Sequence, residues 1–159
     1  MSYDITVYGA NRGTPLTQGE TSLAGHMWIS ITDNEGNTNS YGFQSANHKL
    51  WGKGKVVSTD ITNYQRIDFM QSFKISEAQY NEVKNWADAA KNNGAFGDYN
   101  VLNNSCVDFA WKALTKAEVA YDPLRGIPGT VYLIDRGIPG TVYLIDSKPV
   151  PVTILLWHV

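Results

Sequence analysis

One cysteine and three histidines are the residues of this 159-residue chain that are best suited to covalent catalysis. Cys106 lies in "VLNNSCVDFAWKALTKA", directly after Asn104 and Ser105, where a helix is predicted to begin. A thiol in the first turn of a helix has a lowered pKa, because unpaired backbone N–H groups stabilise the thiolate. The N–H groups of Ser105 and Cys106 could also donate to an oxyanion formed beside the sulfur. The position of Cys106 therefore suits acyl transfer.

The same cysteine also suits a structural role. Cys106, Phe109, Ala110 and Ala113 lie on one face of the predicted helix, and free cysteine is among the most buried residue types. A catalytic interpretation needs a base near the thiol, so the helix alone leaves both interpretations open.

His26 is the candidate base. It follows Gly25 and opens the predicted strand "HMWISIT", where a titratable ring at the mouth of a buried strand could meet the start of a helix. A histidine that only caps or fills the core fits this place as well. His48 lies in a polar loop and His158 at the chain end, so we expect both to be structural or solvated.

A third group should orient the imidazole. The segment "DNEGN" has the composition of a tight hairpin turn. If Asp33 pairs with Asn37, the register places His26 opposite Gln44, whereas a two-residue turn would place Ser45 there. Gln44 is the first choice, although an ordinary amide at a strand end fits the pattern equally well.

The elements that must position these residues are strands first and helices later. Alternating apolar residues predict strands in "YDITVYG", on both sides of the turn at "DNEGN", and in "RIDFMQSFKI". A capping box at Ser76 and Gln79 begins a helix that ends at "NNG", and the Cys106 helix follows. We predict an α+β fold in which an antiparallel sheet packs on the Cys106 helix, with the Ser76 helix alongside.

The C-terminal third contains a tandem repeat. "RGIPGTVYLID" (125–135) is followed at once by an identical copy (136–146), and "VPVTILLWHV" (150–159) is again β-rich. Either copy could fill one slot in the sheet while the other loops out or pairs elsewhere, and strand exchange between chains is possible for the same reason. We assign the repeat no catalytic role and treat 1–159 as a single domain.

Composition excludes several function classes. The net charge of −2 argues against a nucleic-acid partner, and "HKLWGKGK" (48–55), the only basic cluster, is expected to be a solvated loop. A single cysteine forms no intrachain disulfide, and with three dispersed histidines it gives no metal-ligand cluster. Phosphate-binding glycine motifs are absent, so no cofactor is expected. Neither a signal peptide nor a membrane span is found, so we expect a chain made soluble in the cytoplasm.

The two candidate residues lie in motifs with a family resemblance. A Gly-His that opens a hairpin ending in "YGF", followed by "NSCVDFAWKAL", resembles the circularly permuted NlpC-type branch of papain-fold cysteine hydrolases. The helix is similar to that of lecithin:retinol acyltransferase-like relatives, with Ser105 inserted between Asn and Cys. "GHMWISITDNEGNTNSYGF" is similar to small antibacterial effector domains of type VI secretion systems. The repeat departs from this pattern. The resemblance implies a papain-like fold with Cys106 as nucleophile and His26 as base.

The resemblance also implies a function. The expected activity is that of a secreted toxin that cleaves an amide in peptidoglycan stem peptides, acting in the periplasm or envelope of a target cell. Its expected partners are the secretion apparatus and a cognate immunity protein. The first alternative keeps the same residues but takes an ester of a membrane lipid as substrate. The second is a non-catalytic binding or immunity-type domain in which Cys106 belongs to the core.

Overall fold

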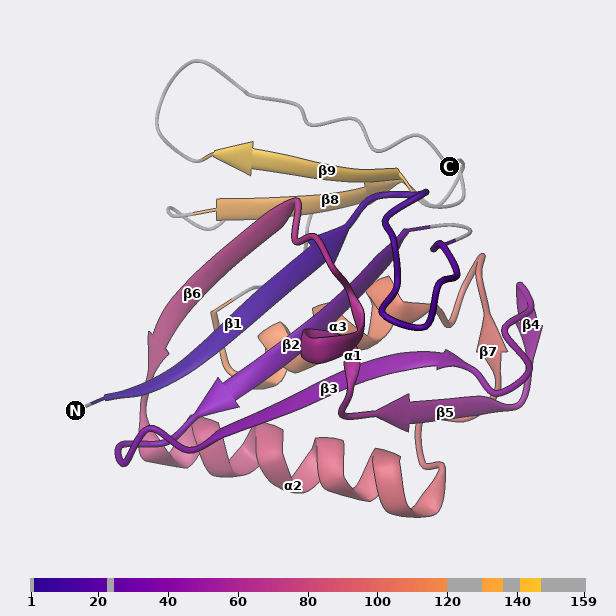
Figure 1. Cartoon of the computed structure of the whole chain (residues 1–159). Coiled ribbons are helices and arrows are strands. Elements are labelled where there is room, and N and C mark those ends of the chain that lie inside the picture. The colour runs from indigo at the N-terminus through magenta and orange to yellow at the C-terminus, as the bar shows by residue number, and fades with distance from the viewer. Residues whose placement is uncertain (1, 23–24, 120–129, 136–140, 147–159) are drawn as a thin grey trace.

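The computed structural model describes residues 2–22 and 25–119, together with two strands at 130–135 and 141–146. Its centre is a five-stranded antiparallel sheet with the strand order β5-β3-β2-β1-β6 (Figure 1). The strands are β1 Tyr3–Ala10, β2 His26–Thr32, β3 Thr38–Ser45, β5 Gly54–Val57 and β6 Phe69–Ile75. The predicted α+β class with an antiparallel sheet is confirmed.

The hairpin between β2 and β3 has the first of the two predicted registers. The N–H of Asp33 donates to the carbonyl of Asn37 at 3.0 Å, and the Asp33 carboxylate accepts the N–H groups of Glu35 and Asn37, each at 2.9 Å. The ladder runs on to the pair Trp28–Gly42. The turn is stable because one aspartate side chain satisfies the backbone donors of the loop.

The Ser76 helix begins and ends where its capping residues predict, and the Cys106 helix begins where it was predicted to begin. α2 spans Glu77–Asn93, with the capping box of Ser76 and Gln79 at its start and Gly94 in the left-handed conformation, φ 64°, at its end. α3 spans Cys106–Lys116. Within the described residues, no helix is long and apolar enough to cross a membrane.

The core lies between the sheet and these two helices. In Figure 1, α3 passes behind the sheet, while the short helix α1 (Asp60–Asn63) crosses in front of it. The buried residues on the helix side come from both layers: Ile5, Val7, Met27, Ile29, Ile31, Tyr41, Phe43, Val56, Tyr80, Val83, Ala87, Ala90, Cys106, Val107, Phe109, Ala110, Ala113, Leu114 and Ala117. On the side of α1, Tyr64 packs against Tyr8 and Trp28. This alternation buries both faces of β2, the strand that begins with His26.

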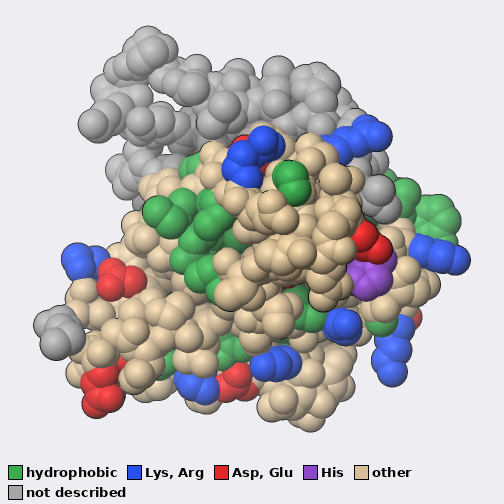
Figure 2. All heavy atoms as spheres, viewed as in Figure 1, with side chains coloured by type: hydrophobic (Ala, Val, Ile, Leu, Met, Phe, Trp, Pro, Cys, Tyr) green, Lys and Arg blue, Asp and Glu red, His purple; other side chains and the backbone are tan. Residues whose placement is uncertain are grey.

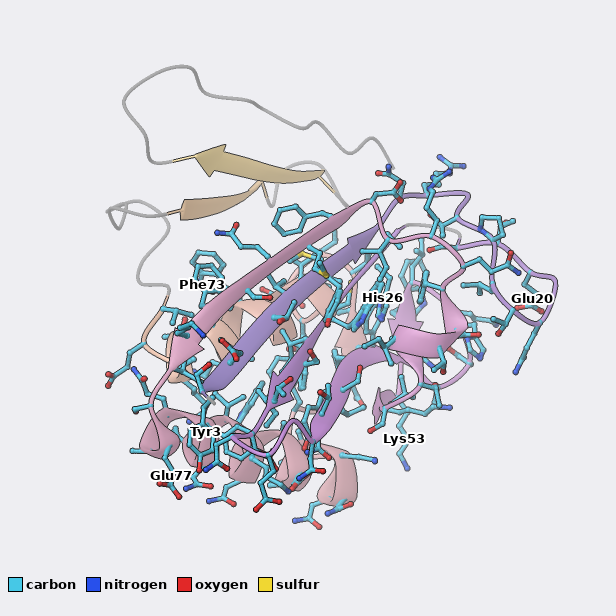
Figure 3. All side chains as sticks on the ribbon, turned by 60° about the vertical axis from the view of Figure 1, so that its left-hand side comes forward. Tyr3, Glu20, His26, Lys53, Phe73 and Glu77 are labelled. Carbon is cyan, nitrogen blue, oxygen red and sulfur yellow. The ribbon has the colours of Figure 1, made fainter. Side chains whose placement is uncertain are left out.

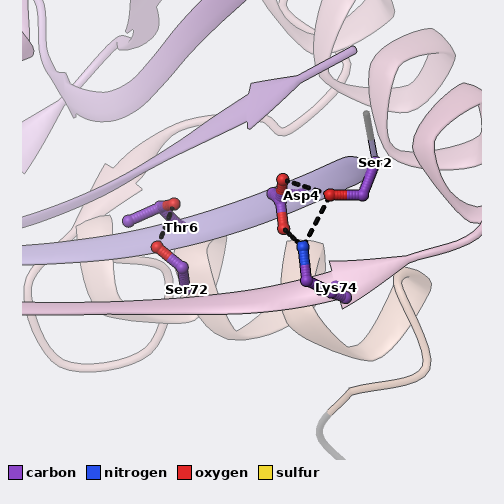
Figure 4. A network of polar contacts seen from close by, with 5 residues as sticks. All are labelled: Ser2, Asp4, Thr6, Ser72 and Lys74. Carbon is purple, nitrogen blue, oxygen red and sulfur yellow. Dashed lines mark hydrogen bonds and ion pairs between the residues drawn. The ribbon is translucent and has the colours of Figure 1, made fainter. Parts of the chain in front are cut away.

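The edge strand β6 is held to β1 by cross-strand polar pairs (Figure 4). The hydroxyls of Thr6 and Ser72 lie 2.7 Å apart, and Lys74 Nζ lies 3.6 Å from Asp4 Oδ1 and 2.6 Å from Ser2 Oγ. Directly opposed pairs of this kind stabilise a register. They fix β1, which pairs with β2 along its other edge.

A second, smaller sheet forms where loops were predicted. β4 (Trp51–Gly52) pairs with β7 (Tyr99–Asn100), so neither the basic segment 48–55 nor the segment after α2 is a plain loop. Two-residue strands give no periodic signal, and their partners are far apart in sequence. This pairing is therefore a tertiary feature.

The repeated segments pair with each other. β8 (Thr130–Asp135) and β9 (Thr141–Asp146) form a separate antiparallel two-stranded sheet, and neither belongs to the five-stranded sheet. The expectation that one copy fills a slot in the main sheet is wrong. Two identical β-rich segments a few residues apart are each other's nearest partner, so a local ladder costs little loop entropy. The β segment predicted at 150–159 lies outside the described residues.

Candidate active site

Cys106 occupies the first position of α3, as predicted. Ser105 is the N-cap, and its hydroxyl accepts the N–H of Val107 at 3.3 Å. The Ser105 N–H donates in turn to the Asp108 carboxylate at 2.9 Å. The Ser105 N–H, one of the two predicted oxyanion donors, is thus engaged in the capping box. The Cys106 N–H, the other predicted donor, lies beside the Tyr99 hydroxyl.

The fold brings His26 to the thiol of Cys106. β2 begins at His26, and its imidazole lies close enough to the Cys106 thiol to lower the pKa of that thiol. The two residues are each 7% exposed, so their interaction is screened only weakly by water. Figure 3 shows His26 among closely packed side chains. The structure therefore places the two candidate residues near each other, and their catalytic pairing stays a prediction.

The group that holds the other end of the imidazole is Asp60. His26 Nε2 lies 2.9 Å from Asp60 Oδ2, and the aspartate is 1% exposed at the start of α1. Because Nε2 faces the carboxylate, Nδ1 is the ring nitrogen left for the thiol. Gln44, the predicted third residue, makes no hydrogen bond with His26 among the described residues. Asp60 lies in an unremarkable polar run, and only the crossing of α1 over β3 reveals its role.

Gly42 makes room for the His26–Asp60 pair. A Cβ atom at this position would lie 1.6 Å from Asp60 Oδ2 and 2.9 Å from His26 Nε2. The two side chains therefore meet directly over the Gly42 Cα. This gives the glycine of "YGF" a specific function, since any larger residue would displace the carboxylate.

Two aromatic rings hold the plane of the imidazole. Tyr64 stacks on His26 with ring centres 5.3 Å apart, and Trp28 lies 5.8 Å away and nearly parallel. The Tyr64 and Trp28 rings also stack on each other at 5.0 Å. Such packing restricts rotation of the ring and keeps its two nitrogens directed at Asp60 and Cys106.

His26 is favoured in its charged form. Burial lowers the pKa of an imidazole, but the negative charge of Asp60 and hydrogen bonds to Asp60 and Cys106 outweigh it. The pKa of His26 is raised well above its usual value of 6.5.

Cys106 is favoured as a thiolate. Burial raises the pKa of a thiol, yet the hydrogen bond and charge of His26, the N–H of Met27 and the hydroxyl of Tyr99 together lower the pKa of Cys106 below its usual 9.0. The pKa of His26 shifts in the opposite direction, so both shifts favour the charged forms of the two side chains.

Tyr99 is a site residue that the sequence did not reveal. It belongs to β7, its ring packs 5.4 Å from that of Phe43, and its hydroxyl contacts both the thiol and the N–H of Cys106. Burial and the neighbouring thiolate raise its pKa, so it stays a protonated donor. The Asn104 amide fixes this segment by donating to the carbonyls of Phe96 and Asp98 at 2.9 and 2.7 Å.

Other sites in the described residues offer less chemistry. A pocket of about 770 Å³ lies beside α2 and the end of α3, lined by Ser76, Ala78, Gln79, Glu82, Thr115, Lys116 and Glu118. It includes none of the site residues named above. No group of three or more His, Cys, Asp or Glu side chains is placed to hold a metal ion within the described part. His48 is an exposed loop residue, and His158 lies outside the described residues.

The arrangement brings together a thiol, an imidazole, a carboxylate and a tyrosine hydroxyl, the groups that acyl transfer can use. Comparison of the chain with family models, with curated proteins and with solved structures found no match.

Proposed function

We propose that this protein is a cysteine hydrolase with Cys106 as nucleophile, His26 as general base and acid, and Asp60 as the residue that orients His26. The observation that carries the proposal is the continuous line from thiol to imidazole to carboxylate, with the last contact at 2.9 Å. Nucleophile, base and orienting group within hydrogen-bond reach are the signature of an activated nucleophile.

The reaction follows from the charges of these groups. The Cys106 thiolate attacks the carbonyl carbon, forming a C–S bond while the carbonyl π electrons move to oxygen. The hydroxyl of Tyr99, beside the sulfur, donates to that oxyanion. The oxyanion collapses, the bond to the leaving group breaks, and the His26 imidazolium protonates the leaving nitrogen or oxygen. Water then attacks the thioester, His26 takes its proton, and the acid leaves as the thiolate is restored.

The substrate class rests first on the family resemblance. We propose a papain-like, permuted NlpC-type hydrolase that cleaves an amide of peptidoglycan in the envelope of a target cell. Export by a secretion apparatus and a cognate immunity protein belong to this proposal. The His26 hairpin preceding the Cys106 helix, and the buried contact between them, support it.

A lipid ester is the second candidate, and one observation favours it. Leu50, Trp51 and Leu102 are exposed large apolar side chains on the two segments that pair as β4 and β7. We call this set the apolar corner. Exposed apolar clusters mark binding surfaces, and this one lies on β4 and beside β7, the strand that carries Tyr99.

Incubation with purified sacculi and, separately, with phospholipid vesicles tests the proposal. Release of muropeptides supports the amide, whereas release of fatty acid without muropeptide cleavage selects the lipid ester. Both activities should be lost in Cys106→Ser and His26→Ala at unchanged folding.

The non-catalytic alternative makes the opposite prediction. A native Cys106 that resists iodoacetamide near neutral pH, together with a Cys106→Ser variant of unchanged function, would overturn the hydrolase.

A further inference from the structure

The apolar corner is an unusual concentration of exposed apolar surface. Trp51 is 66% exposed, Leu102 54% and Leu50 47%. The Val101 N–H donates to the Leu50 carbonyl at 2.9 Å, which holds the two segments side by side. Three of the six exposed large apolar residues in the described part thus share one corner of the fold.

Basic side chains border this corner. Lys49, Lys53 and Lys55 are exposed in the segment that carries Leu50 and Trp51, and residues 46–55 contain no carboxylate. On the β7 side the adjoining acidic residue is Asp98. Figure 3 shows Lys53 pointing away from the ribbon, and Figure 2 shows apolar and basic side chains together at the edge of the molecule where β4 lies. The local charge is therefore positive, although the chain as a whole carries −2.

This combination fits an anionic lipid surface. Tryptophan favours the boundary between headgroups and acyl chains, leucine favours the acyl side, and lysines are attracted to anionic headgroups. A glycan surface would explain a stacked tryptophan, but it would not explain exposed leucines beside lysines.

The corner is connected to the proposed active site by backbone pairing. Trp51 pairs with Asn100 and Gly52 pairs with Tyr99, and the Tyr99 hydroxyl contacts the Cys106 thiol. The strand pair β4–β7 therefore links the apolar corner to the proposed nucleophile.

We propose that the apolar corner docks the protein on an anionic phospholipid bilayer, with Leu50, Trp51 and Leu102 entering the interface and the three lysines contacting the headgroups. The proposal rests on the second candidate of the proposed function, the lipid ester, because docking on a bilayer would present such an ester to Cys106. The docking itself requires no turnover and is measured independently.

Co-sedimentation of the full chain with vesicles tests the docking. Vesicles of phosphatidylglycerol and phosphatidylcholine in equal parts should bind the protein, and phosphatidylcholine alone should bind it less. Trp51→Ser with Leu102→Ser should weaken binding about tenfold or more, because the inserted apolar area is lost. Lys49→Gln with Lys53→Gln should weaken binding and reduce its dependence on salt.

Matched controls distinguish docking from non-specific hydrophobic binding and from catalysis. Met70, 61% exposed on the edge strand β6, lies outside the corner, so Met70→Ser should leave vesicle binding unchanged. Cys106→Ser should bind vesicles as the wild type does, so a failed hydrolase and a failed docking surface give different results. An equal loss in Met70→Ser, an absence of binding to anionic vesicles, or a Trp51-dependent binding to sacculi alone would each overturn the proposal.

Discussion

The His26 imidazole and the Asp60 carboxylate meet over the Cα of Gly42, with Nε2 and Oδ2 2.9 Å apart. Both side chains are almost fully buried, so the charge of the carboxylate acts on the imidazole in a weakly screening environment. Because Asp60 favours the charged form of His26, and charged His26 lowers the pKa of Cys106, the carboxylate also acts indirectly on the thiol. The following predictions test the parts of that chain of contacts.

Asp60→Asn keeps a polar group beside Nε2 but removes the charge. The pKa of His26 should fall, since Asp60 raises it, and the pKa of Cys106 should rise, since charged His26 lowers it. The pH range in which thiolate and imidazolium coexist should therefore narrow from both ends. A pH profile of the hydrolysis rate measures both limbs. Gln44→Ala is the matched control, and a larger loss there than at Asp60 would restore Gln44 as the orienting residue.

The Cys106 thiol should react with iodoacetamide at pH values where an ordinary thiol is protonated. The lowered pKa keeps a thiolate fraction present as pH falls below 9.0, the usual value. In His26→Ala the inflection of the alkylation rate should move to higher pH, because burial raises the pKa of the thiol and His26 no longer lowers it. The alkylation rate constant is measured as a function of pH. An unchanged inflection in His26→Ala would show that His26 does not lower the pKa of Cys106.

Gly42→Ala should abolish activity. The new Cβ would lie 1.6 Å from Asp60 Oδ2, so the carboxylate must leave His26. Overpacking of this kind costs about 1–3 kcal/mol of unfolding free energy, measured by denaturant titration. Ser40→Ala, two residues along the same strand, is the control. It removes a buried hydroxyl that has no hydrogen-bond partner in the described structure, so stability and activity should change little. Equal activities in the two variants would contradict the role of Gly42.

Tyr99→Phe should lower kcat more than it raises KM. The lost hydroxyl contacts the thiol and the Cys106 N–H, and removal of one oxyanion donor costs about 10²–10³ in kcat. Tyr8→Phe is the matched control: it loses a hydrogen bond to Ser30 at 3.0 Å, which does not involve Cys106, and should cost only about 1 kcal/mol of stability. Steady-state kinetics of both variants decide whether the Tyr99 hydroxyl takes part in the reaction.

The sequence by itself determined the elements with local signals. The capping box at Ser76 marked the start of one long helix, and Asn104 and Ser105 marked the start of the other. The turn at Asp33 marked the hairpin that begins with His26, with two possible registers of which the structure has the first. These features depend on side chains and backbone groups a few residues apart, which is why composition and spacing reveal them. Cys106 at the start of α3 and His26 at the start of β2 followed from the same signals.

Only the tertiary structure decided what surrounds the thiol. Asp60 reaches His26 because α1 crosses β3 above a residue without a side chain, and Tyr99 reaches Cys106 because β7 pairs with β4. The two repeat copies have the same sequence, and only the tertiary structure shows that β8 pairs with β9 and that neither pairs with the main sheet. Such contacts join residues far apart in sequence, or choose between identical segments. Their energies come from burial and packing that no local pattern records.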